Sequence, residues 1–350
     1  MDSFTPILIN NRVMKPHKAS LYPDLNSRNV LTYSHWDFVE LWLKRNNKED
    51  ALFYWNQARV FNQASSGLSN QSSPLLHYYS FMNAAKALLS SRDIIFNQHH
   101  GVTAAKNDNY TNEGLETTGI FIKGSGIVPS LATYIKDEDE RKQYSLYDLF
   151  YNLPYIHRTY CLTYNIQEDM FIPIKDAHFI YDASSEHAYF IATLSKDFSY
   201  DGIGELLPNC FQLISDDDNN EYKIRSTYSI NYISQTPPSA NELDMLTSLH
   251  NKIRRNLYYI NGAETLWYIK STINQDRQIL RSPTTITLAA MHRLSELSRY
   301  DPFKLNSFLS GRENWLLAEF IQQSPSQFID EISSEITGHQ FLIPNVRAAK

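Results

Sequence analysis

One stretch, residues 74–92, constrains the fold more than any other because its apolar side chains face almost every direction of a helix. It reads PLLHYYSFMNAAKALLSSR. At helical spacing Leu75, Tyr78 and Met82 share one face, and further apolar residues widen that face nearly all round. Ser73 followed by proline is typical of a helix start, with the serine as N-cap. Because a helix that is apolar on most sides must be surrounded by protein, we predict a central helix here.

The spacing of apolar residues predicts helices on both sides of this stretch and strands between them. Short runs of β-branched and aromatic residues after residue 165 predict strands, and the acidic residues 216–221 are expected to form a turn between two of them. A helix broken at Pro154 is expected at 145–160. The other expected helices cover 35–46, 48–64, 240–260, 263–274, 284–299, 303–309, 313–322 and 326–336.

These patterns predict a mainly α fold of the α+β class. We expect a helical bundle with a small antiparallel β-sheet inserted between N-terminal and C-terminal helical parts. In chain order the expected segments are an irregular N-terminal segment (1–33), a helical part (34–160), a small antiparallel β region (161–236) and a C-terminal helical part (237–350).

The charge and the cysteine content narrow the classes of protein to which this chain can belong. The formal net charge of −6 argues against a general nucleic-acid binder with a strongly basic surface, so any nucleic-acid role needs a local site. Cys161 and Cys210 lie in apolar contexts and form no CxxC pair, which predicts reduced thiols. Neither a secretory signal nor a bilayer-spanning apolar run is evident. We expect a cytoplasmic protein without membrane contact.

The sequence contains none of the motifs that mark common metal or catalytic centres. There is no HExxH helix, no GxSxG elbow and no GxGxxG loop. The acidic residues 216–221 lack the ligand spacing and the distal glutamate of a calcium loop. His157 and Arg158 beside Cys161 suggest a Cys/His pair, but a buried structural cysteine explains the pattern better. We therefore expect no metal and no cofactor.

The central stretch and several later ones resemble known families. The helix at 74–92, with its tyrosine pair and AAKALL, followed by His-His-Gly at 99–101, resembles the central helix of HEPN-type bundles. The same stretch, followed in order by LYYINGAETLWYIK, LSELSRYDP and FLSGRENWLLAEFIQQSPSQFIDEI, resembles the bacterial YaaC-like family over residues 35–338. The resemblance implies a HEPN-related helical core but no particular chemistry, because HEPN relatives include RNA-cleaving toxins, antitoxin partners and antiviral components.

The resemblance to RNA-cleaving HEPN proteins implies a candidate catalytic pair, Arg92 and His99, with six residues between them. In such a site the histidine would act as general acid or base and the arginine would stabilise phosphoryl charge, without a metal and usually across a dimer. The alternative is a structural histidine that helps to end a helix. Two other Arg-to-His pairs of similar spacing occur in the chain and roughly one or two are expected by chance, so spacing alone does not decide.

Two further groups are candidate binding sites. His292, Glu296 and Arg299 share one helix face and suit a phosphate or a protein partner; the alternative is a Glu296–Arg299 ion pair with the histidine at a half-buried edge. The residues KGSG, from Lys123 to Gly126, suit an anion nest made by consecutive backbone N–H groups. A tight turn rather than a helix explains these glycines better, and the P-loop order is not met.

From these observations we expect a YaaC-like binding protein that acts through protein or nucleic-acid contacts. The resemblance alone implies a prokaryotic stress-response or antiviral setting. One alternative is a metal-independent ribonuclease that uses Arg92 and His99; another is a nucleotide-sensing module around Lys123, Arg158 or Arg225. Expected partners are a protein or a second copy of the chain, with RNA or a nucleotide as further ligands. The candidate binding residues are His100, Lys123, Arg158, Arg254, Arg255, His292, Glu296 and Arg299.

Overall fold

The computed structural model describes residues 4–105, 114–214, 222–233, 238–262 and 264–342, and its contacts divide the chain into two compact units. The helical unit consists of residues 32–169 and 276–337. The sheet unit consists of residues 1–31, 170–275 and 338–350. Each unit is therefore assembled from segments that lie far apart in the sequence.

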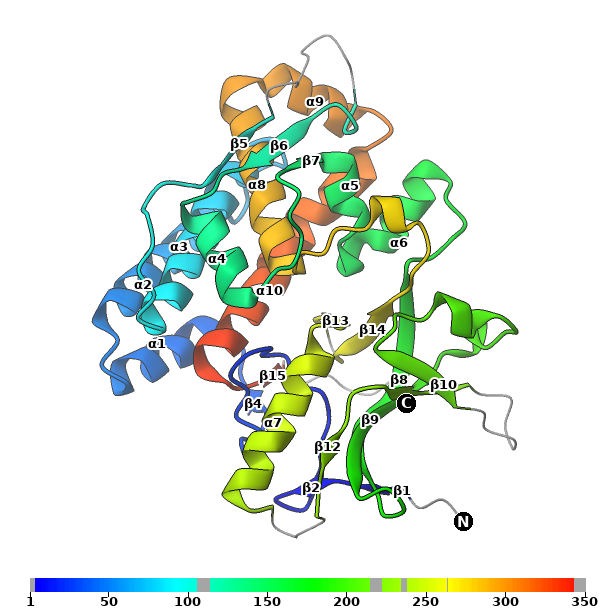
Figure 1. Ribbon diagram of the computed structural model, residues 1–350. Coiled ribbons are helices and arrows are strands. Elements are labelled where there is room, and N and C mark those ends of the chain that lie inside the picture. Colours follow the sequence, from blue (N-terminus) through cyan, green and yellow to red (C-terminus); the bar gives the residue numbers. More distant parts are fainter. Residues whose placement is uncertain (1–3, 106–113, 215–221, 234–237, 263, 343–350) are drawn as a thin grey trace, which may run out of the picture. The chain divides into compact units, whose positions relative to one another are not determined.

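The helical unit is built around the predicted central helix, α3 (Ser73–Ser91), which is buried along nearly its whole length. It packs against α2, α8 and α10 (Figure 1). The Phe81 ring stacks on Phe328 of α10 with ring centroids 4.4 Å apart. The N-cap is Ser72, one residue before the predicted Ser73. The surrounding helices are α1 (His35–Arg45), α2 (Glu49–Ser65), α8 (Pro283–Tyr300), α9 (Pro302–Ser310) and α10 (Asn314–Thr337).

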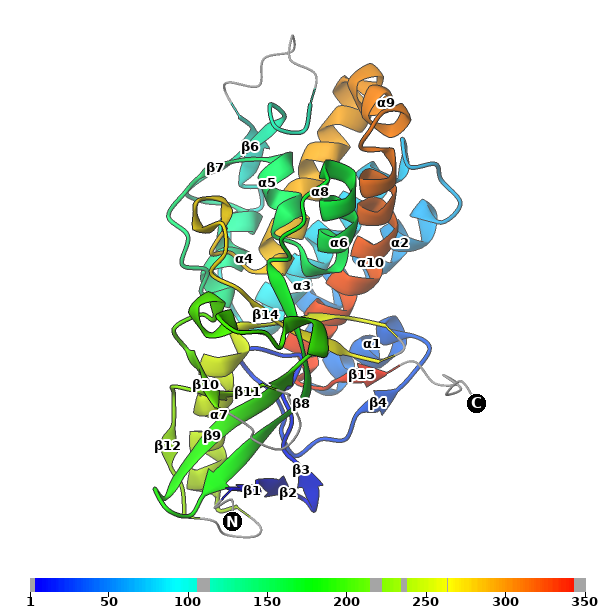
Figure 2. The same ribbon diagram turned by 90° about the vertical axis from the view of Figure 1, so that its right-hand side faces the viewer.

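The middle of the helical unit combines a small sheet with three shorter helices. The antiparallel strands β5 (Val102–Ala104), β6 (Gly119–Ile122) and β7 (Gln143–Ser145) form this sheet, and β5 and β6 lie beside α8. The prediction of a helix broken at Pro154 is confirmed, because one helix ends before this residue and the next begins with it. The helices are α4 (Ile127–Ile135), α5 (Leu146–Tyr151) and α6 (Pro154–Tyr164), of which α6 packs on α10 (Figure 2).

The sheet unit contains a large antiparallel sheet with the strand order β10-β11-β9-β8-β14-β13, to which β1 and β12 add at β8 and β9. A bulge between Lys175 and His178 interrupts the pairing of β8 with β9, and such irregularities increase local twist. The strands are β1 (Phe4–Pro6), β8 (Phe171–Asp182), β9 (His187–Leu194), β10 (Phe211–Ile214), β11 (Lys223–Ser226), β12 (Ile230–Asn231), β13 (Leu257–Ile260) and β14 (Leu266–Lys270).

One helix and several short elements complete the sheet unit. The helix is α7 (Ala240–Arg254), whose Leu246 and Leu249 join the same buried cluster as Phe179 and Phe190 of the sheet. Its N-cap is Ser239, which forms a capping box with Glu242. The remaining elements are β2 (Leu8–Ile9), β3 (Arg12–Val13), β4 (Val30–Leu31), β15 (Phe341–Leu342) and the short 3₁₀ turns Lys196–Phe198, Ile203–Leu206 and Gln275–Arg277.

The predicted helical bundle with a small inserted sheet is wrong. Within the described residues the chain is 47% helical and 19% strand, and its main sheet is a large curled one rather than a minor insertion. Two of its strands, β13 and β14, occupy residues predicted to be helical. Their aromatic side chains match strand preferences, and Asn261-Gly262 between them is a strong hairpin signal. A third contribution, β1, comes from the segment predicted to be irregular.

Two other local predictions need correction. A helix, α4, begins at Ile127 directly after KGSG, where a turn without a helix was expected. Instead of the two helices expected at 313–322 and 326–336, the single helix α10 (Asn314–Thr337) runs through Pro325. An internal proline costs about 3 kcal/mol. Burial of Phe320 and Phe328 on the two sides of this proline offsets that cost, because each buried aromatic ring contributes a comparable amount.

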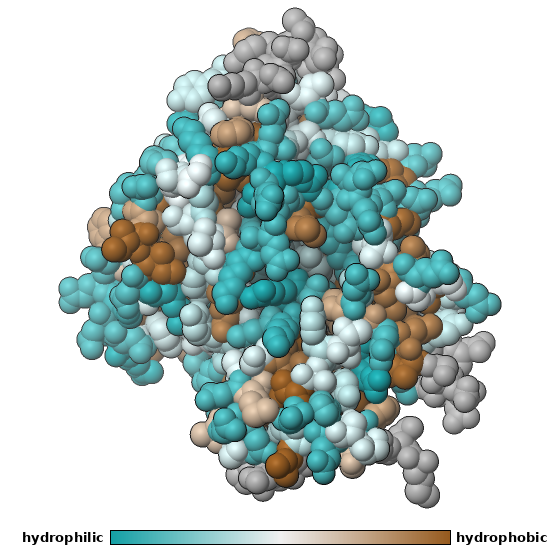
Figure 3. All heavy atoms as spheres, viewed as in Figure 1, coloured by the Kyte–Doolittle hydropathy of each residue, from teal (hydrophilic) through white to brown (hydrophobic). Residues whose placement is uncertain are grey.

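The antiparallel pairing of β10 with β11 fits the expected hairpin, but the acidic residues 216–221 lie outside the described part of the chain. The face seen in Figure 3 is mainly hydrophilic, with apolar side chains in small separate groups. Among the helices that are described, none combines the length and the apolarity that crossing a bilayer requires.

Candidate anion-binding site

Two loops of the helical unit interlock and fix several of the candidate residues. The backbone N–H of Lys123 donates to the carbonyl oxygen of Gly101 at 2.8 Å. The N–H groups of Ile127 and Val128, at the start of α4, donate to the carbonyl oxygens of His99 and His100 at 2.9 and 3.1 Å. Of these three N–H groups only that of Lys123 belongs to KGSG, so the anion nest at Lys123–Gly126 stays a prediction.

Glycine is required where the two loops cross. Gly126 has φ of +115°, and a Cβ atom there would lie 2.6 Å from the backbone nitrogen of Gly101 and 2.7 Å from Nδ1 of His99. Neither the backbone angle nor the space permits a larger residue without rearrangement. Gly101 and Gly126 thus allow the two loops to cross, and the crossing brings Lys123 close to the two histidines.

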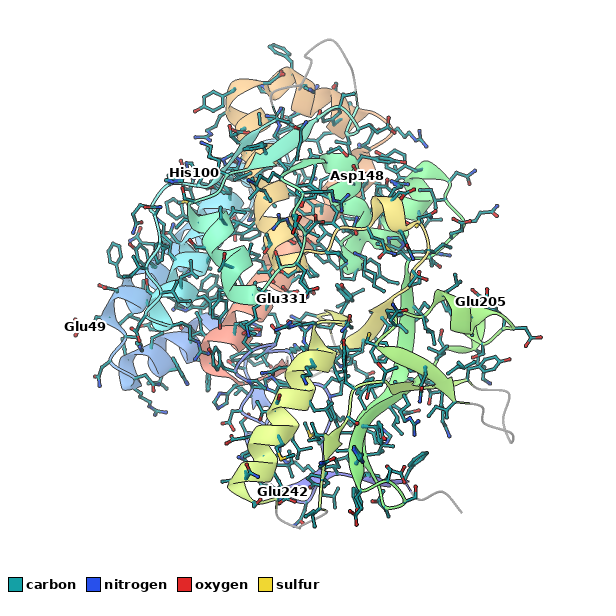
Figure 4. The ribbon with its side chains drawn as sticks, in the orientation of Figure 1. Glu49, His100, Asp148, Glu205, Glu242 and Glu331 are labelled. Carbon is teal, nitrogen blue, oxygen red and sulfur yellow. The ribbon has the colours of Figure 1, made fainter. Side chains whose placement is uncertain are left out.

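Three aromatic rings from three elements meet behind these loops. Tyr78 of α3, His100 before β5 and His292 of α8 form a cluster in which the ring centroids lie 4.8–5.4 Å apart. The Tyr78 hydroxyl forms a short hydrogen bond with Nδ1 of His100, which is labelled in Figure 4. Burial raises the pKa of Tyr78, so its hydroxyl keeps its proton and can donate it to that nitrogen. We call these three residues the ring cluster.

His292 of the ring cluster is buried, with 3% of its surface exposed. Burial is the main cause that lowers its pKa to about 3, with nearby His100, Arg299 and Lys123 acting in the same direction. The imidazole is therefore neutral at physiological pH. Its Nδ1 has no hydrogen-bond partner in the described part of the protein, and the nearest carboxylate oxygen, from Glu296, is 3.8 Å away. Such buried polar atoms are uncommon and point to a water or a ligand.

Cationic side chains surround the ring cluster. Burial lowers the pKa of His100, and the charges of Arg299, Lys86 and Lys123 lower it further, which places all three cations within electrostatic range. Lys123 and Arg299 are exposed to solvent, whereas Lys86 is buried above the ring of Tyr54. Neutral histidines in the ring cluster therefore lie beside exposed cations, and this arrangement suits an anionic ligand.

Glu296 is engaged differently from the prediction. It forms its ion pair with Arg293 at 3.4 Å, not with Arg299 as expected from the helix spacing. Burial raises the pKa of Glu296, although the neighbouring Arg293, Arg299 and Lys123 oppose this rise. Since Glu296 is paired within its own helix, Arg299 keeps its guanidinium for solvent or a ligand, with one weak bond from Nε to the carbonyl of Ser295 at 3.4 Å.

Arg92 and His99, the predicted catalytic pair, contact different parts of the helical unit. The guanidinium of Arg92 donates to the carbonyl oxygens of Glu335 and Ile336, at the end of α10. The imidazole of His99 instead lies 3.3 Å from the hydroxyl of Ser125, in the loop before α4. These partners give Arg92 the role of a helix-end cap and give His99 a place in the interlocked loops. A catalytic role for the two residues stays a prediction.

The other basic candidates lie outside this site. Arg254, in the sheet unit, donates to the carbonyl oxygens of His17, Lys18 and Leu257, so it ties the N-terminal segment to α7. Arg158 pairs with Asp169 at 2.9 Å. Two remaining arginines, the exposed Arg255 and the Arg225 that stacks on Tyr189, belong to the sheet unit.

The sequence predicted several residues of this candidate site but did not show that they lie close together. His100, Lys123, His292 and Arg299 were separate candidates on three stretches of the chain. Tyr78 and Arg293 were missed as site residues, because a tyrosine in an apolar helix stripe is typical of a core. The available signal was the placement of histidines beside apolar helix faces, where a buried polar atom needs a partner.

Comparison with known proteins assigns the chain to a family. The family model described as YaaC-like protein matches residues 25–336, which is most of the chain. The chain belongs to the YaaC-like protein family. This confirms the predicted membership, whereas the resemblance of the helical part to HEPN proteins is not confirmed. Neither the curated proteins nor the solved structures include a match to the chain.

Proposed function

We propose that this YaaC-like protein binds a phosphate-bearing ligand at the ring cluster, namely a nucleotide, free or as part of an RNA strand. One observation carries the proposal. The exposed cations Lys123 and Arg299 stand beside two neutral histidines, one of which has a buried ring nitrogen without a hydrogen-bond partner. A phosphate oxygen fits such a site because it accepts hydrogen bonds from cations and from a neutral imidazole N–H.

Arg299 and Lys123 can bind a phosphate group in different ways. Arg299 offers a planar guanidinium that can bind two phosphate oxygens at once, and Lys123 offers a compact charge on a flexible stem. Binding of a phosphate would also offset the repulsion between these cations and protonated His100. We therefore expect ligand binding to raise the pKa of His100 from its lowered value and to take up protons as the pH falls.

Exposed aromatic side chains next to Arg299 support a nucleotide rather than a simple inorganic anion. Tyr300 is 76% exposed, and the guanidinium of Arg299 lies 4.9 Å from the centre of its ring. Phe303, at the start of α9, is 88% exposed. Bases stack on such rings, with a gain of about 1–3 kcal/mol for each base. A basic residue with an adjacent exposed ring is a common arrangement in single-strand recognition.

Binding is favoured over catalysis by the protonation states of the histidines. A general acid or base works best with a pKa near the working pH, and that of His292 is about 3. The Arg92–His99 ribonuclease stays an alternative prediction, and it requires Arg92 to leave the end of α10. A protein partner also stays a prediction, and so does a setting in prokaryotic stress response or antiviral defence, which rests on the family resemblance alone.

The proposal is tested by measuring thermal stability in the presence of pyrophosphate, mono-, di- and cyclic nucleotides, and short single-stranded RNA. At least one phosphate-bearing probe should raise the melting temperature of the wild type, because ligands that bind the folded state stabilise it. The rise should disappear in Lys123→Ala and Arg299→Ala but persist in Lys44→Ala, which removes an exposed lysine of α1. A flat response to every probe would refute the proposal. If RNA does not raise the melting temperature but a nucleotide does, the ligand is a free nucleotide.

A further inference from the structure

Three potential metal ligands converge at the end of α6, away from the ring cluster. They are His157, Cys161 and Asp169, and one ligand atom of each lies within 4.8 Å of the other two. His157 and Cys161 are four residues apart on one face of α6. Asn165 then reverses the chain with φ of 56°, and Ile166 donates its N–H to the carbonyl oxygen of Cys161 at 2.9 Å. This reversal returns Asp169 to the same place.

The histidine is oriented as a metal ligand would be. Nδ1 of His157 lies 2.8 Å from the carbonyl oxygen of Tyr151, to which it can only donate a proton. Nε2 therefore carries the lone pair, and it points to Sγ of Cys161 at 3.4 Å. Metal-binding histidines are held in the same way, with the second ring nitrogen donating to a backbone carbonyl or a carboxylate.

The carboxylate of Asp169 is also held in place by a neighbour. Nη1 of Arg158 lies 2.9 and 3.2 Å from its two oxygens. A carboxylate bound by an arginine still has lone pairs for a metal, and such outer hydrogen bonds are usual around metal ligands. His157 and Cys161 are buried, whereas the Asp169 side chain is 26% exposed. Asp169 thus lies where an ion could enter from solvent.

We propose that His157, Cys161 and Asp169 bind one Zn²⁺ ion. A thiolate and an imidazole favour zinc over magnesium or calcium, which prefer oxygen ligands. Zinc bonds are about 2.0–2.3 Å long, so the three side chains need only small rotations to close around the ion. On binding, zinc replaces the proton on Sγ of Cys161, and that proton passes to solvent. Three protein ligands leave a fourth position for water or another oxygen donor.

The sequence indicated the pair His157 and Cys161 but not the third ligand, Asp169, for a physical reason. Metal motifs with known spacing place their ligands on a hairpin or on adjacent helix turns, as in HExxH or paired CxxC. Here the third ligand is brought back by a left-handed residue after the helix, and spacing alone does not reveal such a reversal. The expectation of no metal rested on the absence of those motifs and on the interpretation of Cys161 as a buried structural cysteine.

The test uses Co²⁺ as a spectroscopic substitute for zinc in the full-length protein after treatment with a chelator. Wild type should bind about one ion per chain and show the thiolate-to-cobalt charge-transfer band, which added Zn²⁺ then removes. Cys161→Ser should lose the band, whereas Cys210→Ser, which changes the other buried cysteine, should keep it. Asp169→Asn should weaken binding at least about tenfold.

Two results would overturn the proposal. One is a wild-type protein with no charge-transfer band and no zinc retained after dialysis, which would leave a simple hydrogen bond between Cys161 and His157. The other is a band that survives in Cys161→Ser and disappears in Cys210→Ser. If circular dichroism shows that Cys161→Ser does not fold, Asp169→Asn decides, because this partly exposed carboxylate can be neutralised without removing a buried group. An unchanged affinity in that variant then refutes the proposal.

Discussion

At the scale of single residues, Arg92 shows how burial and partners set the role of a side chain. It lies at the C-cap of α3, and its guanidinium bonds to two carbonyl groups at the end of α10. The last carbonyls of a helix have no partner within the helix, and a cation there is favoured by the helix dipole. Arg92 therefore stabilises the contact between two central helices.

Replacement of this arginine gives the first prediction. Arg92→Ala should lower the free energy of unfolding by about 1.5–3 kcal/mol, which is typical for hydrogen bonds from a charged group. Chemical denaturation followed by circular dichroism measures this change. Arg45→Ala, which alters an exposed arginine of α1, serves as control and should change stability by less than about 0.5 kcal/mol. Equal stability of the two variants would mean that Arg92 does not act as a cap.

Residue types and spacing predicted candidates but not their surroundings. The stripe His292, Glu296 and Arg299 was correctly placed on one helix, yet His292 proved to be buried and Glu296 paired with Arg293. Glu296 has an arginine three residues before it and another three residues after it. The surrounding tertiary contacts decide with which of the two it pairs. Lys123 and His100 come from loops, so no periodicity connects them to α8.

At the scale of elements, the loops that carry HHG and KGSG act as one unit. Their backbone hydrogen bonds connect residues 99–101 with 123–128 and set the start of α4. The absence of a side chain at Gly126 is what permits this contact. The position of Lys123 relative to the ring cluster depends on it.

The second prediction concerns this crossing. Gly126→Ala should destabilise the protein by about 2 kcal/mol or more, because it adds backbone strain at positive φ and a clash with Gly101. Gly124→Ala is the matched control, since an added Cβ there meets nothing within 4 Å. Thermal unfolding of the two variants beside the wild type provides the measurement. Similar melting temperatures for both variants would show that the close contact between Gly126 and Gly101 does not stabilise the protein.

Helices were predicted better than strands, and the reason lies in the range of the stabilising contacts. The periodicity of α3 and α8 arises within each helix, so their bounds could be read closely from the sequence. Strand β14 instead pairs with β8, almost one hundred positions earlier, and its register depends on that partner. The aromatic residues of β13 and β14 also fit a helix face when the partner strand is unknown. Pro325 was misread because tertiary packing holds α10 together across it.

At the scale of the whole molecule, neutral histidines are buried in both units. Burial is the largest cause that lowers the pKa of His77 and His250 to about 4 and that of His292 to about 3, and it lowers the pKa of His17 strongly. In the unfolded chain these histidines take up protons below about pH 6.5. Asp137 acts in the opposite direction, because burial raises its pKa to about 6.

The third prediction follows from the sign of these shifts. Between about pH 6.5 and pH 4 the unfolded state binds more protons than the folded state at each such histidine, so stability falls as the pH falls. Each histidine contributes a slope of up to about 1.4 kcal/mol per pH unit. Asp137 and Glu296 offset part of the total.

A single substitution isolates this effect. His77→Phe keeps an aromatic ring beside Phe81 and removes the titrating group, so its stability should fall less steeply with acidification than that of the wild type. Urea denaturation at a series of pH values gives both slopes. Parallel curves for the two proteins would contradict the assignment of a neutral buried imidazole at His77.

The division of the chain into two units could not be foreseen from the order of its segments. The sheet unit joins the N-terminal residues, a long central segment and the C-terminal residues, and the helical unit joins two separate segments. One link in the sheet unit is the parallel pairing of β4 with β15, which lie close to opposite ends of the sequence.

Calorimetric titration of the nucleotides and the short RNA into wild type, Lys123→Ala, Arg299→Ala and the control Lys44→Ala tests the proposed ligand site directly. We expect saturable binding of at least one of these ligands to wild type and to the control. We also expect at least about tenfold weaker binding to both site variants, as expected for the loss of a charge-assisted contact worth about 1.5–3 kcal/mol. Equal affinities in all four proteins, or no binding by the wild type, would contradict the proposed ligand site.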